Sequence, residues 1–69
     1  MKLSLPEIAT ILAALQLYRE SGYGNPEMYR WVSPRITAIA DWSGRVEPLE
    51  DKEIDVLMSR IRASGEALA

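Results

Sequence analysis

The 69-residue chain contains neither cysteine nor histidine, and this absence is its strongest constraint on folding. A domain of this size buries only about 60% of the surface that its unfolded chain exposes, so small domains usually need disulfides, a metal or a partner subunit. Without cysteine no disulfide can form, and without both residue types the common zinc sites are excluded. The sequence therefore predicts a small single domain that is stabilised as a homo-oligomer.

A run of acidic residues is the remaining candidate for a metal site, and it consists of Glu50, Asp51, Glu53 and Asp55. The run lacks the glycine turn and the ligand spacing of a calcium loop. It also precedes an apolar repeat of helical spacing, and carboxylates at a helix start are stabilised by the positive end of the helix dipole. We interpret the run as a helix start and predict neither a metal site nor a cofactor.

The first helix signal is a capping box, because Ser4 precedes Glu7 by three positions and Pro6 stands near the first helical position. It predicts a helix over residues 5–20, ended by the glycines that follow. Isoleucine, leucine and alanine occur on more than one side of this helix, and such a wide apolar surface fits burial against two neighbours.

Proline divides the middle of the chain. Asn-Pro at residues 25–26 predicts a short helical turn over residues 26–32, with the asparagine as its cap. Ser-Pro at residues 33–34 predicts a second helix over residues 34–42, with the serine as its cap. The residues that this helix would turn inward are Ile36, Ile39 and Ala40.

The most regular helix signal lies near the C-terminus, where four apolar residues repeat at helical spacing: Ile54, Leu57, Met58 and Ile61. We predict a helix over residues 50–64, closed by Gly65 and followed by a frayed end over residues 66–69. Strict alternation of apolar and polar residues, which is typical of strands, is absent. The predicted fold class is therefore all-α, with about three main helices.

Composition and motifs argue against several classes of function. Catalysis usually needs a group that titrates near neutral pH or an activated nucleophile, and this chain has no histidine, no cysteine and no serine-nucleophile motif. We therefore predict no catalytic residues. The net charge of −2 and the few polar residues of the second helix argue against nucleic-acid binding. The apolar run over residues 8–15 is too short to span a membrane, so we expect a cytoplasmic protein.

All five aromatic residues lie between residues 18 and 42, and arginine residues are interspersed among them. Tyrosine, tryptophan and arginine are favoured on recognition surfaces because each combines a large contact area with a directed polar group. Tyr18 and Trp42 lie in register with apolar helix faces, and we interpret them as core residues. Tyr23, Tyr29 and Trp31 belong to a connection of the kind that usually lies at the surface, so they predict a contact surface or a subunit interface.

Two kinds of partner fit this segment. Aromatic rings could stack on the base of a nucleotide-like ligand while guanidinium groups bind its phosphates, or the same residues could dock onto another protein and block it. The use of arginine rather than lysine favours the nucleotide-derived ligand. A structural or assembly accessory, whose aromatic residues only join subunits, is a third possibility. The candidate ligand-binding residues are Arg19, Tyr23, Tyr29, Arg30, Trp31, Arg35 and Arg45.

The outer segments LSLPEIATILAALQLYRESG and VEPLEDKEIDVLMSRI resemble a pattern in very small, mostly uncharacterised helical proteins of phages and bacterial mobile elements. The resemblance covers residues 4–22 and 46–61 and has no counterpart for residues 25–35. Such phage proteins commonly act by stoichiometric binding: some block a host defence complex, and others sequester the nucleotide signals that host defence uses. The resemblance therefore implies a phage-derived inhibitor of host defence that acts without catalysis in the bacterial cytoplasm.

Overall fold

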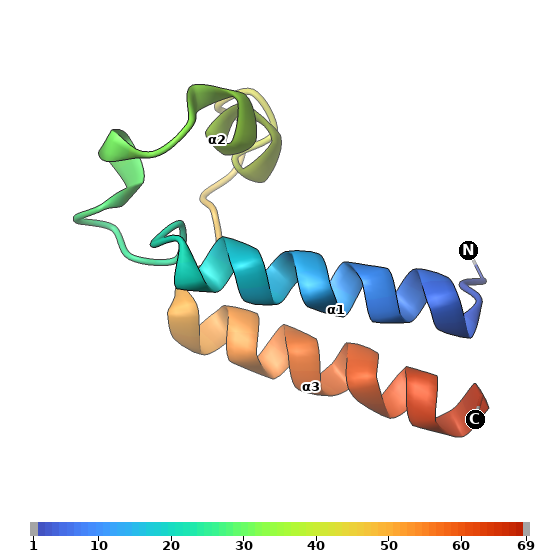
Figure 1. Ribbon diagram of the computed structural model, residues 1–69. Coiled ribbons are helices and arrows are strands. Elements are labelled where there is room, and N and C mark those ends of the chain that lie inside the picture. The colour runs from blue at the N-terminus through green and yellow to red at the C-terminus, as the bar shows by residue number, and fades with distance from the viewer. Residues whose placement is uncertain (1, 69) are drawn as a thin grey trace.

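Two long helices form an antiparallel hairpin in the computed structural model, which describes residues 2–68 (Figure 1). Helix α1 spans Leu5–Glu20 and helix α3 spans Asp51–Leu68. The start of α1 lies beside the end of α3 (Figure 1). The described residues contain helices and turns but no strand, so the all-α prediction is confirmed.

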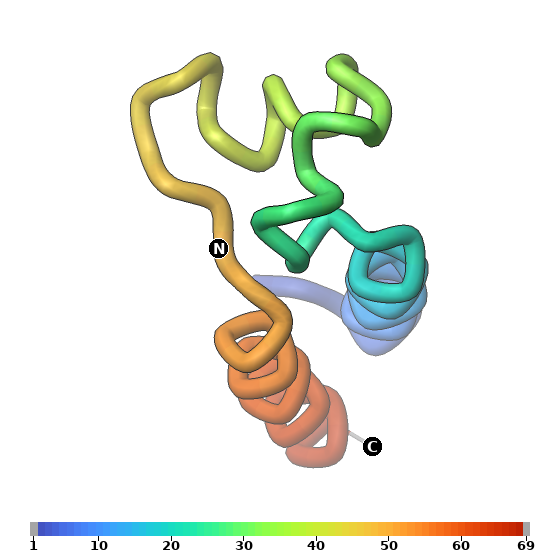
Figure 2. The backbone as a smooth tube through the Cα atoms, turned by 90° about the vertical axis from the view of Figure 1, so that its left-hand side faces the viewer, coloured from blue at the N-terminus to red at the C-terminus, as the bar shows by residue number. Residues whose placement is uncertain are grey.

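The middle of the chain forms an arm, which we define as residues 25–50. It contains a 3₁₀ turn, η1, over Tyr29–Trp31, and a short helix, α2, over Pro34–Ala40. Seen along the hairpin, the arm lies on one side of the α1–α3 pair (Figure 2). Within residues 2–68, α1 and α3 are the helices that pack together extensively. The arm therefore leaves much of α1 uncovered on that side.

Helix α1 begins and ends as its local sequence predicts. The backbone N–H of Ser4 donates to Glu7 Oε1 at 2.7 Å, and the backbone N–H of Glu7 donates to Ser4 Oγ at 3.3 Å. These two bonds complete the capping box. At the other end, Gly22 has a φ of +90°, and its N–H donates to the carbonyl of Arg19. The left-handed glycine is the usual device for closing a helix, so the predicted helix over residues 5–20 is confirmed.

The core is a narrow seam between α1 and α3. The buried apolar residues of the described chain are Ile8 on α1 and Ile54 and Met58 on α3. Farther along the same seam, Gly65 is also buried, and a Cβ atom built on it would lie 3.2 Å from Ile8 Cγ2. The missing side chain therefore lets the two helices approach closely at this point.

The structure corrects the predicted bounds of the last helix. Helix α3 runs from Asp51 to Leu68, so the prediction that Gly65 closes it was wrong. Contact with α1 holds this glycine in helical geometry in spite of its low intrinsic helix propensity. The predicted frayed end is helical as far as Leu68, and residue 69 lies outside the described residues. The acidic residues do form the start of the helix, where the N–H of Glu50 donates to Glu53 Oε1 at 3.1 Å.

The arm differs from its prediction in length and in capping. The predicted turn over residues 26–32 is a turn followed by the shorter η1. Helix α2 ends at Ala40, two residues before the predicted end, and the side chain of Ser33 makes no capping hydrogen bond. The hydroxyl of Tyr29 donates to the carbonyl of Thr37 at 3.1 Å, which ties η1 to α2. In the part of the chain that the structure describes, no helix is long and apolar enough to cross a membrane.

Candidate functional site

Arg19 is engaged within the hairpin. Its Nε donates to Asp55 Oδ1 at 2.7 Å, and its Nη2 donates to Asp55 Oδ2 at 3.1 Å. The hydrogen bonds and charge of Asp55 raise the pKa of the Arg19 guanidinium. This bidentate pair joins α1 to α3, so a ligand would have to displace Asp55 to reach the guanidinium.

Tyr23 and Tyr29 are half-buried and make contacts within the chain. The ring of Tyr23 stacks on Tyr18 of α1, with 4.8 Å between centroids and 18° between planes. Tyr29 uses its hydroxyl to hold Thr37 of α2. Partial burial raises the pKa of both Tyr18 and Tyr29 above the ordinary tyrosine value. These rings therefore position the arm, and they offer less free surface than the sequence predicts.

The remaining candidates lie on the arm. Trp31 is 76% exposed, and the guanidinium carbon of Arg30 lies 6.0 Å from the centroid of its ring. Arg35 is exposed on the first turn of α2. Arg45 lines a small hollow of about 340 Å³ together with Ile39 and Trp42. The predicted binding residues are thus distributed between the hairpin and the arm rather than gathered in one pocket.

Trp42 corrects the sequence interpretation, because it is 67% exposed and does not belong to the core. Helix α2 has already ended, and Trp42 has a φ of +52°. The turn is set by Asp41, whose carbonyl accepts the N–H of Arg45 at 2.9 Å and whose Oδ1 accepts the N–H of Gly44 at 3.0 Å. This turn takes Trp42 out of the register of the helix.

The predicted inward residues of α2 are also divided. Ile39 is 71% exposed, so its inward placement was wrong. Ile36 and Ala40 do turn toward the hairpin and line a groove there. Ile36 and Ala40 are four positions apart and share one side of α2, whereas Ile39 lies beside that side and faces solvent.

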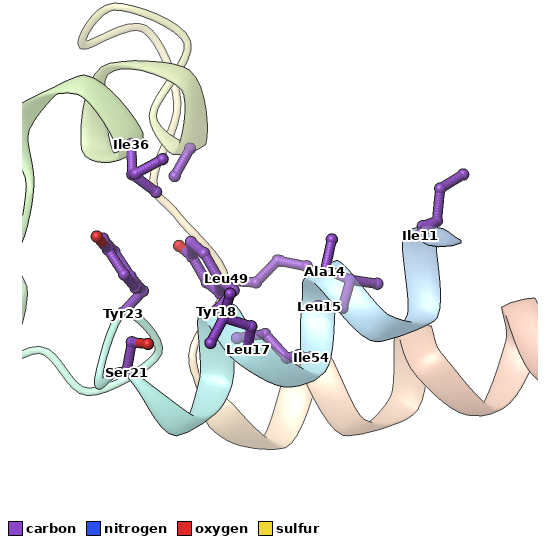
Figure 3. Close-up of a pocket in the computed structure, with 11 residues that line it drawn as sticks. Ile11, Ala14, Leu15, Leu17, Tyr18, Ser21, Tyr23, Ile36, Leu49 and Ile54 are labelled. Carbon is purple, nitrogen blue, oxygen red and sulfur yellow. The ribbon is translucent and has the colours of Figure 1, made fainter. Parts of the chain in front are cut away.

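This apolar groove, with a volume of about 620 Å³, lies between α1, α2 and the residues that precede α3, and it is larger than the hollow beside Trp42. In Figure 3, Ile11 and Ala14 point away from α3, and Ile36 points from α2 toward Tyr18 and Tyr23. Among the described residues that line the groove, none is charged, and Tyr23 is the one that belongs to the predicted binding residues. The apolar residues on several sides of the first helix were the sequence signal for this surface.

The arm and the groove differ in the side chains that they present to solvent. The arm offers exposed tryptophan and arginine, and the groove offers aliphatic and tyrosine side chains. Within residues 2–68, no three side chains of the metal-binding types gather closely enough to hold an ion. No protein-family model, curated protein or solved structure matches this chain.

Proposed function

We propose that this protein is a non-catalytic binding protein that docks onto another protein through the tryptophan and arginine side chains of its arm. The observation that carries the proposal is the exposure of Trp31 and Trp42, which are more than two-thirds open to solvent. Tryptophan and arginine are enriched among the residues that supply most of the energy of protein interfaces. Each exposed tryptophan has an arginine near it: Arg30 lies beside Trp31, and Arg45 lines the same hollow as Trp42.

The backbone at Trp42 supports a role beyond folding. A bulky residue rarely adopts a positive φ, and the left-handed conformation costs about 1–2 kcal/mol relative to the right-handed one. Trp42 adopts this conformation although its exposed ring contributes little to the core. Backbone strain that exposes a large apolar side chain is typical of functional positions.

The resemblance of the outer helices to small phage proteins supplies the biological setting of the proposal. The protein acts as a stoichiometric inhibitor of a host defence protein, in the cytoplasm of the bacterial host and as a homo-oligomer. The small core, with three buried apolar residues among those described, supports the homo-oligomer.

A nucleotide-derived ligand is the second candidate, supported by the guanidinium of Arg30 beside the ring of Trp31. A ring can stack on a base while an arginine binds phosphate. Two observations place this candidate second. None of the described residues that line the apolar groove is an arginine, and Arg19 is already paired with Asp55.

The test combines capture of a partner with native mass spectrometry. Wild-type protein is compared with Trp31→Ala, Trp42→Gly, Arg30→Lys and Arg45→Lys in pull-downs from host lysate. The same proteins are then incubated with a panel of cyclic and ADP-ribose-type nucleotides. Glycine adopts positive φ without strain, so Trp42→Gly removes the ring without a cost to the turn. Val56→Ala is the matched control, because Val56 is 61% exposed on α3, away from the arm.

If the proposal is correct, one host protein is retained by wild type and Val56→Ala and is lost from both tryptophan variants. Loss of an interface tryptophan costs about 2 kcal/mol or more, which weakens binding about thirtyfold. The second candidate is supported if the mass spectrum of wild type shows whole-number equivalents of one bound nucleotide and that of Arg30→Lys shows none. Lysine cannot reproduce the bidentate binding of phosphate by arginine. Equal retention of the host protein by all variants would overturn the assignment to the arm.

A further inference from the structure

We propose that the apolar groove between α1 and α2 is the contact surface for a second copy of this chain, and that α1 of each copy packs against α1 of the other. The homo-oligomer is part of the proposed function, and the location of its interface is a separate inference that rests on the uncovered side of α1 and the groove beside it. The groove is lined by Ile11 and Ala14 on the side of α1 that faces away from α3 (Figure 3).

The middle of helix α1 has no face that is suited to water. Residues 8–15 read IATILAAL, and the single polar side chain among them, Thr10, donates its hydroxyl to the carbonyl of Pro6 at 2.9 Å. A helix that is apolar on all sides is normally buried on all sides. In the single chain, Ile8 is buried against α3 while Ala13 and Ala14 remain exposed. The alanines leave room for a second helix to approach closely.

The exposed area agrees with a missing subunit. The chain exposes 5541 Å². A compact monomer of 7.7 kDa exposes about 4,300 Å², so the surplus is about 1,200 Å². The radius of gyration is 12.8 Å, where a compact domain of this length has about 11 Å. Stable dimers bury about 800 Å² or more on each partner. The surplus therefore matches what one dimer interface removes.

The composition of the groove favours a second copy of this chain, rather than a charged partner, as its occupant. In a two-fold dimer the same patch meets itself, so a charge close to the axis would face the same charge of the other copy. The residues of the described chain that line this groove carry no charge, and such a surface can pair with itself without repulsion. Its polar groups are hydroxyls of Tyr18, Ser21 and Tyr23 along one end, each of which can both donate and accept.

The test measures the mass in solution of full-length wild type and of two matched variants, Ala14→Glu in the groove and Ala63→Glu on the exposed side of α3. Both variants add the same charge to an exposed alanine of a long helix. We expect light scattering after size exclusion to give a dimer for wild type and for Ala63→Glu. We expect Ala14→Glu to lose the dimer, because two glutamates would be buried against each other.

Two further measurements keep the test decisive if Ala14→Glu does not fold. The melting temperature of wild type should rise with protein concentration, as it does for a dimer that dissociates on unfolding. The chain has no cysteine, so Ala14→Cys and Ala63→Cys each carry one thiol for labelling. Labelling should be at least tenfold slower at position 14, because only that site is covered by the second copy.

A monomeric mass for wild type with equal labelling at the two positions would overturn the proposal. So would a monomer whose groove binds an apolar dye, since the groove would then be a ligand site. Trp31→Ala and Trp42→Gly should remain dimers, because their side chains lie outside the groove. The oligomeric state of each variant therefore reports on this interface, and partner capture reports on the arm, so the two proposals can fail independently.

Discussion

Helices α1 and α3 are similar in length and pack along one shared seam, but their outer surfaces differ in kind. On α3 the buried residues Ile54, Met58 and Gly65 follow one stripe, and most of the remaining positions are charged or polar. On α1 the apolar residues continue around the helix, and Leu17 is mostly exposed although it is as apolar as the core. The outer surface of α3 is therefore mostly suited to water, whereas the outer surface of α1 leaves apolar residues without a neighbour.

This difference teaches how much of a small domain can be understood from one chain. An amphipathic helix identifies the one neighbour that it needs, because its polar face is satisfied by water. A helix that is apolar on all sides requires further neighbours, and they can belong to the same chain or to another. If α3 is stabilised only at the seam and α1 depends on contacts beyond it, substitutions on the outer sides of the two helices should differ in their effect on stability.

The largest effect is expected for Ile54→Ala. Ile54 is 1% exposed, and truncation of a fully buried isoleucine costs about 2–5 kcal/mol. A core this small cannot absorb such a loss, so we expect the thermal transition, followed by far-ultraviolet circular dichroism, to disappear or to fall sharply. Val56→Ala on the solvent side of α3 should change stability by less than about 0.5 kcal/mol. A similar loss for both variants would mean that α3 also packs on its outer side.

A smaller loss is expected for Gly65→Val. The first added carbon would lie 3.2 Å from Ile8 Cγ2, and the valine methyls would extend farther toward α1. Crowding a packed core costs about 1–3 kcal/mol, which urea denaturation can measure. Ala63→Val controls for the low helix propensity of valine, because Ala63 is exposed on the same helix. Equal stability of the two variants would refute the close approach of the helices at Gly65.

Ser4→Ala tests the start of α1 and should cost about 1 kcal/mol, because it removes a side-chain cap. The control is Ser59→Ala on the exposed surface of α3, which removes no cap and should leave stability unchanged or slightly higher. Hydrogen bonds from Ser4 lower the pKa of Glu7. Ionised Glu7 stabilises the folded state at a pH above the ordinary glutamate pKa, and this stabilisation is lost as the pH falls through the lowered pKa of the folded state. The larger contribution comes from the backbone N–H of Ser4, which Ser4→Ala keeps, so both proteins should lose stability in acid and the difference between them should change little.

The smallest expected effect is an alkaline sensitivity of the groove side of α1. Partial burial raises the pKa of Tyr18, with smaller contributions from Tyr23 and Asp41. The folded state thus favours the neutral phenol. This stabilisation is complete below the unfolded tyrosine value of about 10 and is lost as the pH rises through the higher folded value. Melting temperatures measured across this range should fall for wild type and fall less for Tyr18→Phe, and parallel curves would show that Tyr18 does not contribute.

Much of the hairpin could be predicted because its signals are local. The capping box at Ser4 and Glu7, and the glycines that follow the first helix, act within a few residues of the bonds that they form. The predicted end of the last helix failed at Gly65 because the contact with Ile8 lies in another helix and overrides intrinsic propensity. The core assignment of Trp42 failed because the turn at Asp41 changes the direction of the chain after α2.

The candidate site could be predicted in composition but not in arrangement. The arginine residues interspersed among the aromatic residues identified Arg30, Trp31 and Arg45, which the structure places on the exposed arm. The sequence could not show that Asp55 forms an ion pair with Arg19, because these two residues lie 36 positions apart in the chain. It also missed the groove, which exists only where α2 comes close to α1.

The sequence by itself determined the all-helical class, the starts of α1 and α3, and the shortage of core, because caps, periodicity and composition act locally or additively. The tertiary structure decided which arginines are already paired, which tryptophans are open to solvent, and which side of α1 remains uncovered. These features depend on the path of the arm, and that path is set by contacts between residues far apart in the sequence.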